Sequence, residues 1–205
     1  MNGFGRTGTM FGFQQFEGVL PDMYTFAKGV TSAYIPLSGV GCRQEIFDHF
    51  KKNPLGIGST YSGHPVAMAA GYSTLKHNLE INLVDHVKNV AGPVMYEEIN
   101  KLAAAHPSIK ECRSYGLGSG VDLADKHGNF ITSMHEPSAG IDMLRRELRN
   151  DGLITFARGH HMHFCPPLII TPDEIRESFE ILDRNFTKLD EYILDQPDTP
   201  ESGCW

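Results

Sequence analysis

The clearest pattern of hydrophobic and polar positions lies near the end of the chain, where apolar residues recur every three or four positions. On a helix, one face would carry the side chains of Ile175, Phe179, Leu182, Phe186 and Leu189. The preceding Thr171-Pro172-Asp173-Glu174 has the pattern of a capping box with proline at the first helical position. This combination predicts a long amphipathic helix that begins at the cap.

Two further segments after residue 80 show helical periodicity. The apolar positions between residues 83 and 102 follow one helix face, but the pattern shifts by one position at Gly92-Pro93. This predicts one long helix with a kink at the proline. A shorter helix is predicted around Ile141, Leu144 and Leu148.

The first 80 residues show a different pattern, in which short apolar runs alternate with helices. The runs Met23–Ala27 and Leu37–Val40 look like buried strands, and helices are predicted over residues 43–52 and through residues 66–70. Such alternation is typical of an α/β layer.

After residues 80 to 90 the chain changes character, because long amphipathic helices flank short strand-like runs. These runs lie around Val121, over Leu153–Phe156 and over Met162–Cys165, and the combination is typical of a small α+β domain. We therefore expect two structural parts and a loose tail, over residues 1–85, 86–195 and 196–205.

The composition is that of a globular protein and excludes several classes. Among the 205 residues, 40% are hydrophobic, and 18 Lys and Arg against 25 Asp and Glu give a net charge of -7. A protein that binds nucleic acid through its phosphates needs a basic excess instead. No apolar run approaches the roughly 20 residues of a membrane span. Four dispersed cysteines favour neither disulfides nor a zinc ribbon, so we expect a cytoplasmic protein.

Lys28 stands where an apolar strand-like run ends, and open α/β sheets bind ligands at the carboxyl ends of their strands. Desolvation there would favour the free amine, which can attack a carbonyl carbon and form a Schiff base. Gly29 would leave room for a bulky adduct near the backbone. The alternative is an ordinary lysine whose side chain extends into solvent.

The loop Gly58–His64 combines glycines and hydroxyl groups with a predicted helix start. Free N–H groups in the first helical turn can hold a phosphate, which Thr60 would also hydrogen-bond. The alternative is an ordinary helix cap by Ser62.

Two other motifs contain residue types that are found at metal or dinucleotide sites. On a strand, His161, His163 and Cys165 would share one face at steps of about 6.6 Å, but no carboxylate is close in sequence and no fourth ligand is evident. We therefore expect no metal site, and a metal-dependent hydrolase is the least favoured function. Gly3–Gly8 matches G-x-G-x-x-G, but no strand precedes it and no helical pattern follows. We expect a tight glycine loop there.

Several segments, in matching order and spacing, together resemble the class III aminotransferases, which are pyridoxal 5'-phosphate (PLP) enzymes of fold type I. The segments are Asn2–Gly8, Pro21–Gly29, Ile35–Gly39, Thr60–Pro65 and Pro166–Thr171. The resemblance spans nearly the whole chain. It implies an α/β fold, with part of a PLP-binding large domain followed by an α+β C-terminal small domain.

The resemblance also implies roles for individual residues. Lys28 matches the lysine that forms the Schiff base with PLP and later moves a proton between substrate and cofactor. Thr60 matches the threonine that binds the cofactor phosphate from the neighbouring subunit, which implies a homodimer. Arg158 is near the place where many members hold an arginine for an acidic substrate group, although the register before Pro166 puts Phe156 at the usual position.

Within the family, this chain most resembles members that use taurine or another ω-amino acid as donor. Their acceptor is pyruvate or another 2-oxo acid. The resemblance implies a ping-pong transaminase. It also implies that roughly half a family member is absent, including the aspartate that pairs with the pyridinium nitrogen. We therefore expect a fragment that folds incompletely and turns over slowly. The alternative is a noncatalytic remnant that keeps the dimer surface.

Overall fold

The computed structural model describes residues 2–133, 135–136 and 138–196. It divides the chain into two compact units, Met1–Asn89 (unit 1) and Val90–Trp205 (unit 2). The domain ranges expected from the sequence, 1–85 and 86–195, stay a prediction. Apart from Gln196, the predicted tail at 196–205 lies outside the described residues.

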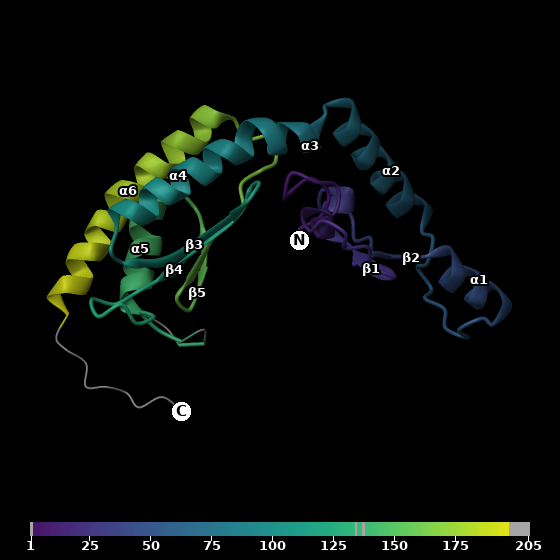
Figure 1. The fold of residues 1–205 in the computed structure, drawn as a ribbon, viewed down its shortest axis with the longest axis horizontal. Helices are drawn as coiled ribbons and strands as arrows, with labels where there is room; N and C mark the ends of the chain where they lie inside the picture. The colour runs from purple at the N-terminus through teal and green to yellow at the C-terminus, as the bar shows by residue number, and fades with distance from the viewer. Residues whose placement is uncertain (1, 134, 137, 197–205) are drawn as a thin grey trace. The chain divides into compact units, whose positions relative to one another are not determined.

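Unit 1 consists of short helices and one pair of strands (Figure 1). In chain order, its elements are a 3-10 turn η1 (Gly12–Gln15), strand β1 (Met23–Phe26), a 3-10 turn η2 (Lys28–Thr31), strand β2 (Gly39–Cys42) and the helices α1 (Gln44–Lys52), α2 (Pro65–Glu80) and α3 (Leu83–His86).

The two strands of unit 1 form an antiparallel pair in which Met23 faces Cys42 and Phe26 faces Gly39. Exposed and half-buried residues alternate along both strands, so the prediction of two buried strands is wrong. A short apolar run does not reveal how many strands will flank it, and a two-stranded ribbon cannot bury both of its faces. Side chains at Gly39 and Gly41 would collide with the rings of Phe26 and Tyr24.

An aromatic cluster and a glycine loop form the centre of unit 1. The Phe4 ring is 8% exposed and lies edge-on to the rings of Phe11 and Phe26, with centroids 5.9 and 6.0 Å away. The Phe4 N–H donates to the Met10 carbonyl at 2.6 Å, which closes the loop. The predicted tight glycine loop is therefore confirmed.

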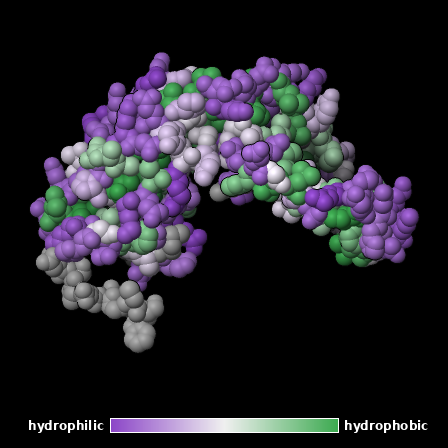
Figure 2. Space-filling view, viewed as in Figure 1, coloured by the Kyte–Doolittle hydropathy of each residue, from purple (hydrophilic) through white to green (hydrophobic). Residues whose placement is uncertain are grey.

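Many large apolar side chains of unit 1 remain exposed, and Figure 2 shows hydrophobic residues at the surface of this unit. On α2 they include Met68 and Tyr72, and in the loop before it Ile57 and Tyr61. Exposed apolar patches of this kind are typical of interaction surfaces.

The helical path from α3 continues through a π-helical segment, η3 (Val87–Ala91), into α4 (Gly92–Ala105). The predicted long helix is thus present, and its irregularity is a π turn that ends immediately before Gly92-Pro93. Because proline cannot donate a backbone hydrogen bond, the helix adjusts its pattern in the preceding turn.

Over the residues that the structure describes, unit 2 is a four-stranded antiparallel sheet with three helices. Its remaining elements are β3 (Ile109–Tyr115), β4 (Gly118–Leu123), α5 (Ala139–Asn150), β5 (Phe156–Arg158), β6 (His161–Phe164) and α6 (Pro172–Asp195). The sheet order is β3-β4-β6-β5, and α6 packs against α4 and α5 (Figure 1). The core draws on all three helices and the sheet, with the most deeply buried side chains including Ile99, Val121, Leu144, Met162 and Phe186.

His106, at the end of α4, ties this helix to α6. Its ring is 5% exposed, and its two nitrogens lie 2.7 Å from Asp190 Oδ2 and 3.1 Å from Asp183 Oδ1. The Phe186 ring lies against it, with centroids 5.5 Å apart. Both ring nitrogens of His106 therefore contact carboxylates of α6, beside the apolar contact with Phe186.

The predicted capping box at the start of α6 is confirmed. Thr171 Oγ1 accepts from the Glu174 N–H at 3.2 Å, and the Glu174 carboxylate accepts from the Thr171 N–H at 2.8 Å. The hydrogen bonds from the Thr171 backbone and side chain lower the pKa of Glu174. The cap therefore stabilises the helix above the ordinary carboxyl pKa and weakens as the pH falls through the lowered value.

Thr171→Ala is expected to lower the free energy of unfolding by about 1 kcal/mol at pH 7. Its loss of stability at acid pH should also be smaller than that of the wild type, because one of the bonds that favour ionised Glu174 is gone. Urea denaturation followed by circular dichroism measures both effects. Thr187→Ala is the matched control, since Thr187 lies inside α6 and caps nothing. An equal loss in the two variants would contradict the prediction.

Candidate active site

Lys28 is the first residue of η2 and follows the end of β1 by two positions. Its φ of 56° is in the left-handed region, which costs a residue with a Cβ roughly 1–2 kcal/mol. Backbone strain of this kind persists where the surrounding structure enforces it and is concentrated at functional sites. The position at the strand end is as predicted, whereas the left-handed backbone was not foreseen.

The expected desolvation of Lys28 is wrong for this chain, because its side chain is exposed. In the described residues β1 pairs with β2 alone, and no further strand covers the end of β1. Gly29 also has a different role from the one expected. A Cβ there would lie 3.2 Å from the Phe4 Cβ, so the glycine makes room for this buried ring.

The loop before α2 supplies no side-chain cap to the first N–H groups of this helix. Thr60 is exposed in a turn closed by the Ser62 N–H, which donates to the Ser59 carbonyl at 2.9 Å. The residue that precedes α2 is His64, and its side chain caps nothing; the alternative of a cap by Ser62 is therefore wrong. Within the described residues, the buried Nδ1 of His64 has no hydrogen-bond partner. The loop can thus receive an anionic group.

Packing connects the two candidate segments of unit 1. Helix α2, which begins after the Thr60 loop, packs on η2, which begins at Lys28. A Cβ at Gly71 of α2 would lie 3.8 Å from the Val30 carbonyl oxygen. The small residues of α2 thus allow a close approach to η2.

Arg158 belongs to unit 2, on strand β5. Arg158 and Phe156 are both exposed and alternate with the half-buried Ala157, which confirms that they share one strand face. The Arg158 Nη2 lies 3.4 Å from His135 Nδ1. Its cross-strand partner is His161, and that of Phe156 is His163.

Asp122 of β4 contacts His161 of β6, a pairing that the sequence did not reveal. Asp122 of β4 is 5% exposed; its carboxylate lies 2.5 Å from His161 Nδ1 and also pairs with Arg113. Burial raises the pKa of Asp122, but the hydrogen bonds from His161 and Arg113 outweigh it and hold the pKa below its ordinary value. Burial and the neighbouring His161 lower the pKa of His163. The sequence feature that could have indicated these contacts is an aspartate within the apolar run of β4.

The three-ligand zinc arrangement of His161, His163 and Cys165 does not form. Strand β6 ends at Phe164, and Cys165 is exposed beyond it. Across the described ranges, no group of three or more His, Cys, Asp or Glu side chains could hold a metal ion. The metal-hydrolase alternative therefore lacks its ligand set.

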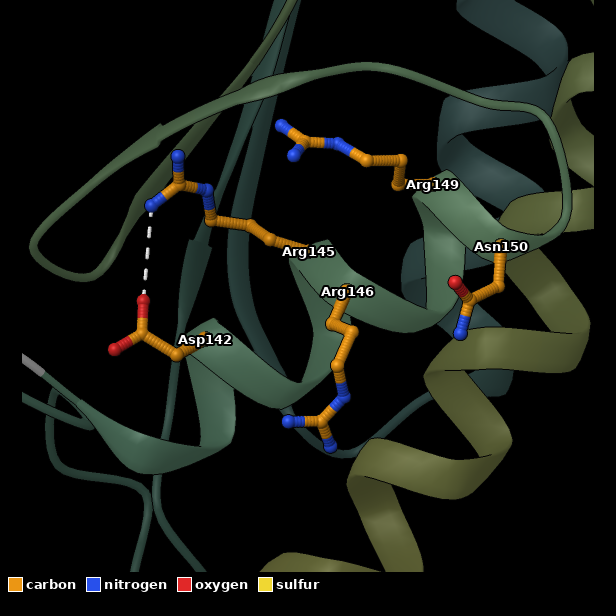
Figure 3. A pocket seen from close by; sticks show the side chains of 5 residues that line it. All are labelled: Asp142, Arg145, Arg146, Arg149 and Asn150. Carbon is orange, nitrogen blue, oxygen red and sulfur yellow. Dashed lines mark ion pairs between the residues drawn. The ribbon is translucent and has the colours of Figure 1, made fainter.

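A hollow of about 210 Å³ lies along α5, and none of the predicted site residues lines it (Figure 3). Arg145 and Arg149 extend to the same side of the helix, and Arg145 lies 3.6 Å from Asp142. Arg146 points to another side. The hollow is therefore a shallow feature of one charged helix face.

The comparison with protein families decides between these readings. The family described as aminotransferase class-III matches residues 1–186. The chain belongs to the class-III aminotransferases. The expected fold class, a part of fold type I with mixed α/β structure, is thereby confirmed.

Curated relatives in this family are transaminases with different amino donors in their names. The chain is 37% identical to gamma-aminobutyrate transaminase 1, mitochondrial, of Oryza sativa. The alignment of 183 residues covers 87% of this chain and 35% of that protein. It is 39% identical over 178 residues to the putrescine–pyruvate aminotransferase of Pseudomonas aeruginosa, covering 85% and 38%. The chain thus spans little more than a third of the length of these class-III relatives.

Solved transaminase structures match the fold closely. The taurine:2-oxoglutarate aminotransferase from Bifidobacterium kashiwanohense, in complex with PLP and glutamate, has a TM-score of 0.87 and 37% identity, covering 93% of this chain and 43% of that one. An S-selective transaminase from Arthrobacter sp. has a TM-score of 0.86 and 29% identity. Class-III aminotransferases use PLP, as predicted. No helix in the described part of the chain is long and apolar enough to cross a membrane.

Proposed function

We propose that the protein acts in transamination with PLP, with Lys28 as the catalytic residue. The observation that carries the proposal is the class-III family match over residues 1–186. Within this range, Lys28 follows the end of a strand and has a left-handed backbone. When bound, PLP supplies an electron sink for the bonds at the substrate's amine-bearing carbon. In this proposal Lys28 Nζ binds the cofactor covalently and then carries a proton to and from that carbon.

The phosphate would be held by Thr60 and the start of α2. The Thr60 hydroxyl can donate to a phosphate oxygen, and the first N–H groups of α2 have no side-chain acceptor. The residues present therefore fit an anionic cofactor group.

We also propose a homodimer in which Thr60 serves the neighbouring subunit's site. The exposed apolar residues of unit 1, among them Tyr61 next to Thr60 and Met68 and Tyr72 on α2, support this proposal. A partner that covers them would also desolvate groups that are exposed in the single chain. For the compartment we propose the cytoplasm, because the dispersed cysteines suit a reducing environment.

For the substrates we propose an ω-amino acid or a taurine-like donor and pyruvate or another 2-oxo acid as acceptor. Gamma-aminobutyrate, putrescine and taurine, named in the relatives, all carry a terminal primary amine. Two of them also carry an acid group at the other end, which a guanidinium such as that of Arg158 would pair with.

A donor panel tests this proposal. The protein with PLP and pyruvate should convert taurine and gamma-aminobutyrate slowly, with ping-pong kinetics. Arg158→Ala should raise KM for these acids about tenfold, the equivalent of a lost charge-assisted hydrogen bond. Putrescine, which has no acid group, is the matched control and should keep its KM. Absence of transfer from all three donors at saturating PLP would contradict the proposed activity, and equal effects on all three would exclude Arg158.

A further inference from the structure

Two histidines of β6 share one face of the unit 2 sheet. His161 and His163 alternate with Met162 and Phe164, which are 0% and 7% exposed and belong to the core. The two imidazole rings contact each other edge to face, with centroids 4.2 Å apart and an interplanar angle of 89°. Both rings are half-buried and can be reached from solvent.

The nitrogen atoms of His161 have distinct environments. The Nδ1 lies 2.5 Å from the Asp122 carboxylate, which Arg113 also holds. Because a carboxylate accepts, Nδ1 is the nitrogen that donates there, and in the neutral imidazole Nε2 carries the lone pair that a metal ion needs. Histidines that bind metals show the same arrangement, since a carboxylate on the second nitrogen fixes the ring and strengthens the ligand.

The Nε2 edge of His161 lies over Gly120 of the neighbouring strand β4. A Cβ at Gly120 would lie 3.0 Å from His161 Cε1 and 3.1 Å from His161 Nε2, so this edge of the ring lies over the glycine. Gly120 is also the cross-strand partner of His163. Both histidines therefore neighbour a residue of β4 that has no side chain.

We propose that His161 and His163 form a two-point site for a divalent transition-metal ion such as Ni²⁺, Cu²⁺ or Zn²⁺. Imidazole nitrogen suits these ions, whereas Mg²⁺ and Ca²⁺ prefer oxygen. Since the described residues supply no third His, Cys, Asp or Glu to a common centre, water completes the coordination. The site needs no PLP and does not depend on the proposed transaminase activity.

Calorimetric titration of the whole chain with Ni²⁺ at pH 7.5 under reducing conditions tests the site. We expect His161→Ala and His163→Ala each to weaken binding at least tenfold. Asp122→Asn, which leaves both histidines, should weaken it about 10- to 100-fold. His127→Ala, on an exposed turn, is the matched control and should change the affinity by less than twofold. Affinities within twofold of the wild type in both single variants would overturn the proposal.

A measurement on the wild type keeps the proposal testable if a variant fails to fold. Substoichiometric Ni²⁺ is paramagnetic and broadens the NMR signals of the nearest imidazole protons first. We expect the ring signals of His161 and His163 to broaden before those of the other histidines. Earlier broadening of any other histidine, or no selective broadening, would overturn the proposal.

Discussion

Lys28→Ala is expected to abolish covalent trapping of PLP completely. In the wild type, borohydride reduction after incubation with PLP should fix the cofactor on one peptide, the one that contains Lys28. Lysine is the natural partner of a carbonyl carbon because its amine both attacks and is regenerated. The Lys28 side chain extends from a left-handed backbone two residues after the end of β1. Mass spectrometry of the digested protein measures the result.

The control for this experiment is Lys52→Ala, at the end of α1, which removes an equally exposed lysine. It should leave the labelling of the Lys28 peptide unchanged. Lys28→Gly is a second variant, because glycine tolerates a positive φ without strain; it should also remain unlabelled. Specific labelling that persists in both Lys28 variants would assign the covalent bond to another residue and end the proposed role.

Phe186→Ala is expected to cost about 3–5 kcal/mol of unfolding free energy, the usual range for a phenylalanine deleted from a core. The side chain is fully buried on α6 and lies against the His106 ring. Its loss would leave a cavity next to the hydrogen bonds of His106 with Asp183 and Asp190. Urea denaturation followed by circular dichroism measures the effect.

Leu194→Ala on the same helix is the matched control, because Leu194 is 67% exposed. Its effect should stay within about 0.5 kcal/mol, as for most surface substitutions. If the two variants lost similar stability, unit 2 would not be organised around the α4–α6 contact. A Phe186→Leu variant, which retains most of the apolar volume, should fall between them.

The helices of unit 2 could be predicted from sequence because their information is local. The capping box at Thr171 and the apolar positions of α6 lie within one segment, and the observed helix begins at Pro172. The periodicity around Leu144 likewise predicted α5. Each of these helices buries the face that its own residues define.

Features that depend on distant residues could not be predicted in the same way. The pairing of β1 with β2 alone decides that these strands stay half-exposed, and a run of four apolar residues does not contain that information. Asp122 and His161 are separated by 39 positions in sequence, so their contact follows only from the order of the strands. For the candidate site, the sequence located Lys28 at a strand end, but neither its exposure nor its left-handed φ follows from its neighbours.

The β1–β2 ribbon has a consequence for how this protein can diverge. Phe26 and Tyr24 lie across the bare backbone of Gly39 and Gly41. A larger residue at either glycine therefore requires the opposing ring to move aside or to become smaller. The two sides of the ribbon should therefore evolve as coupled pairs, so that lineages differ at both positions or at neither.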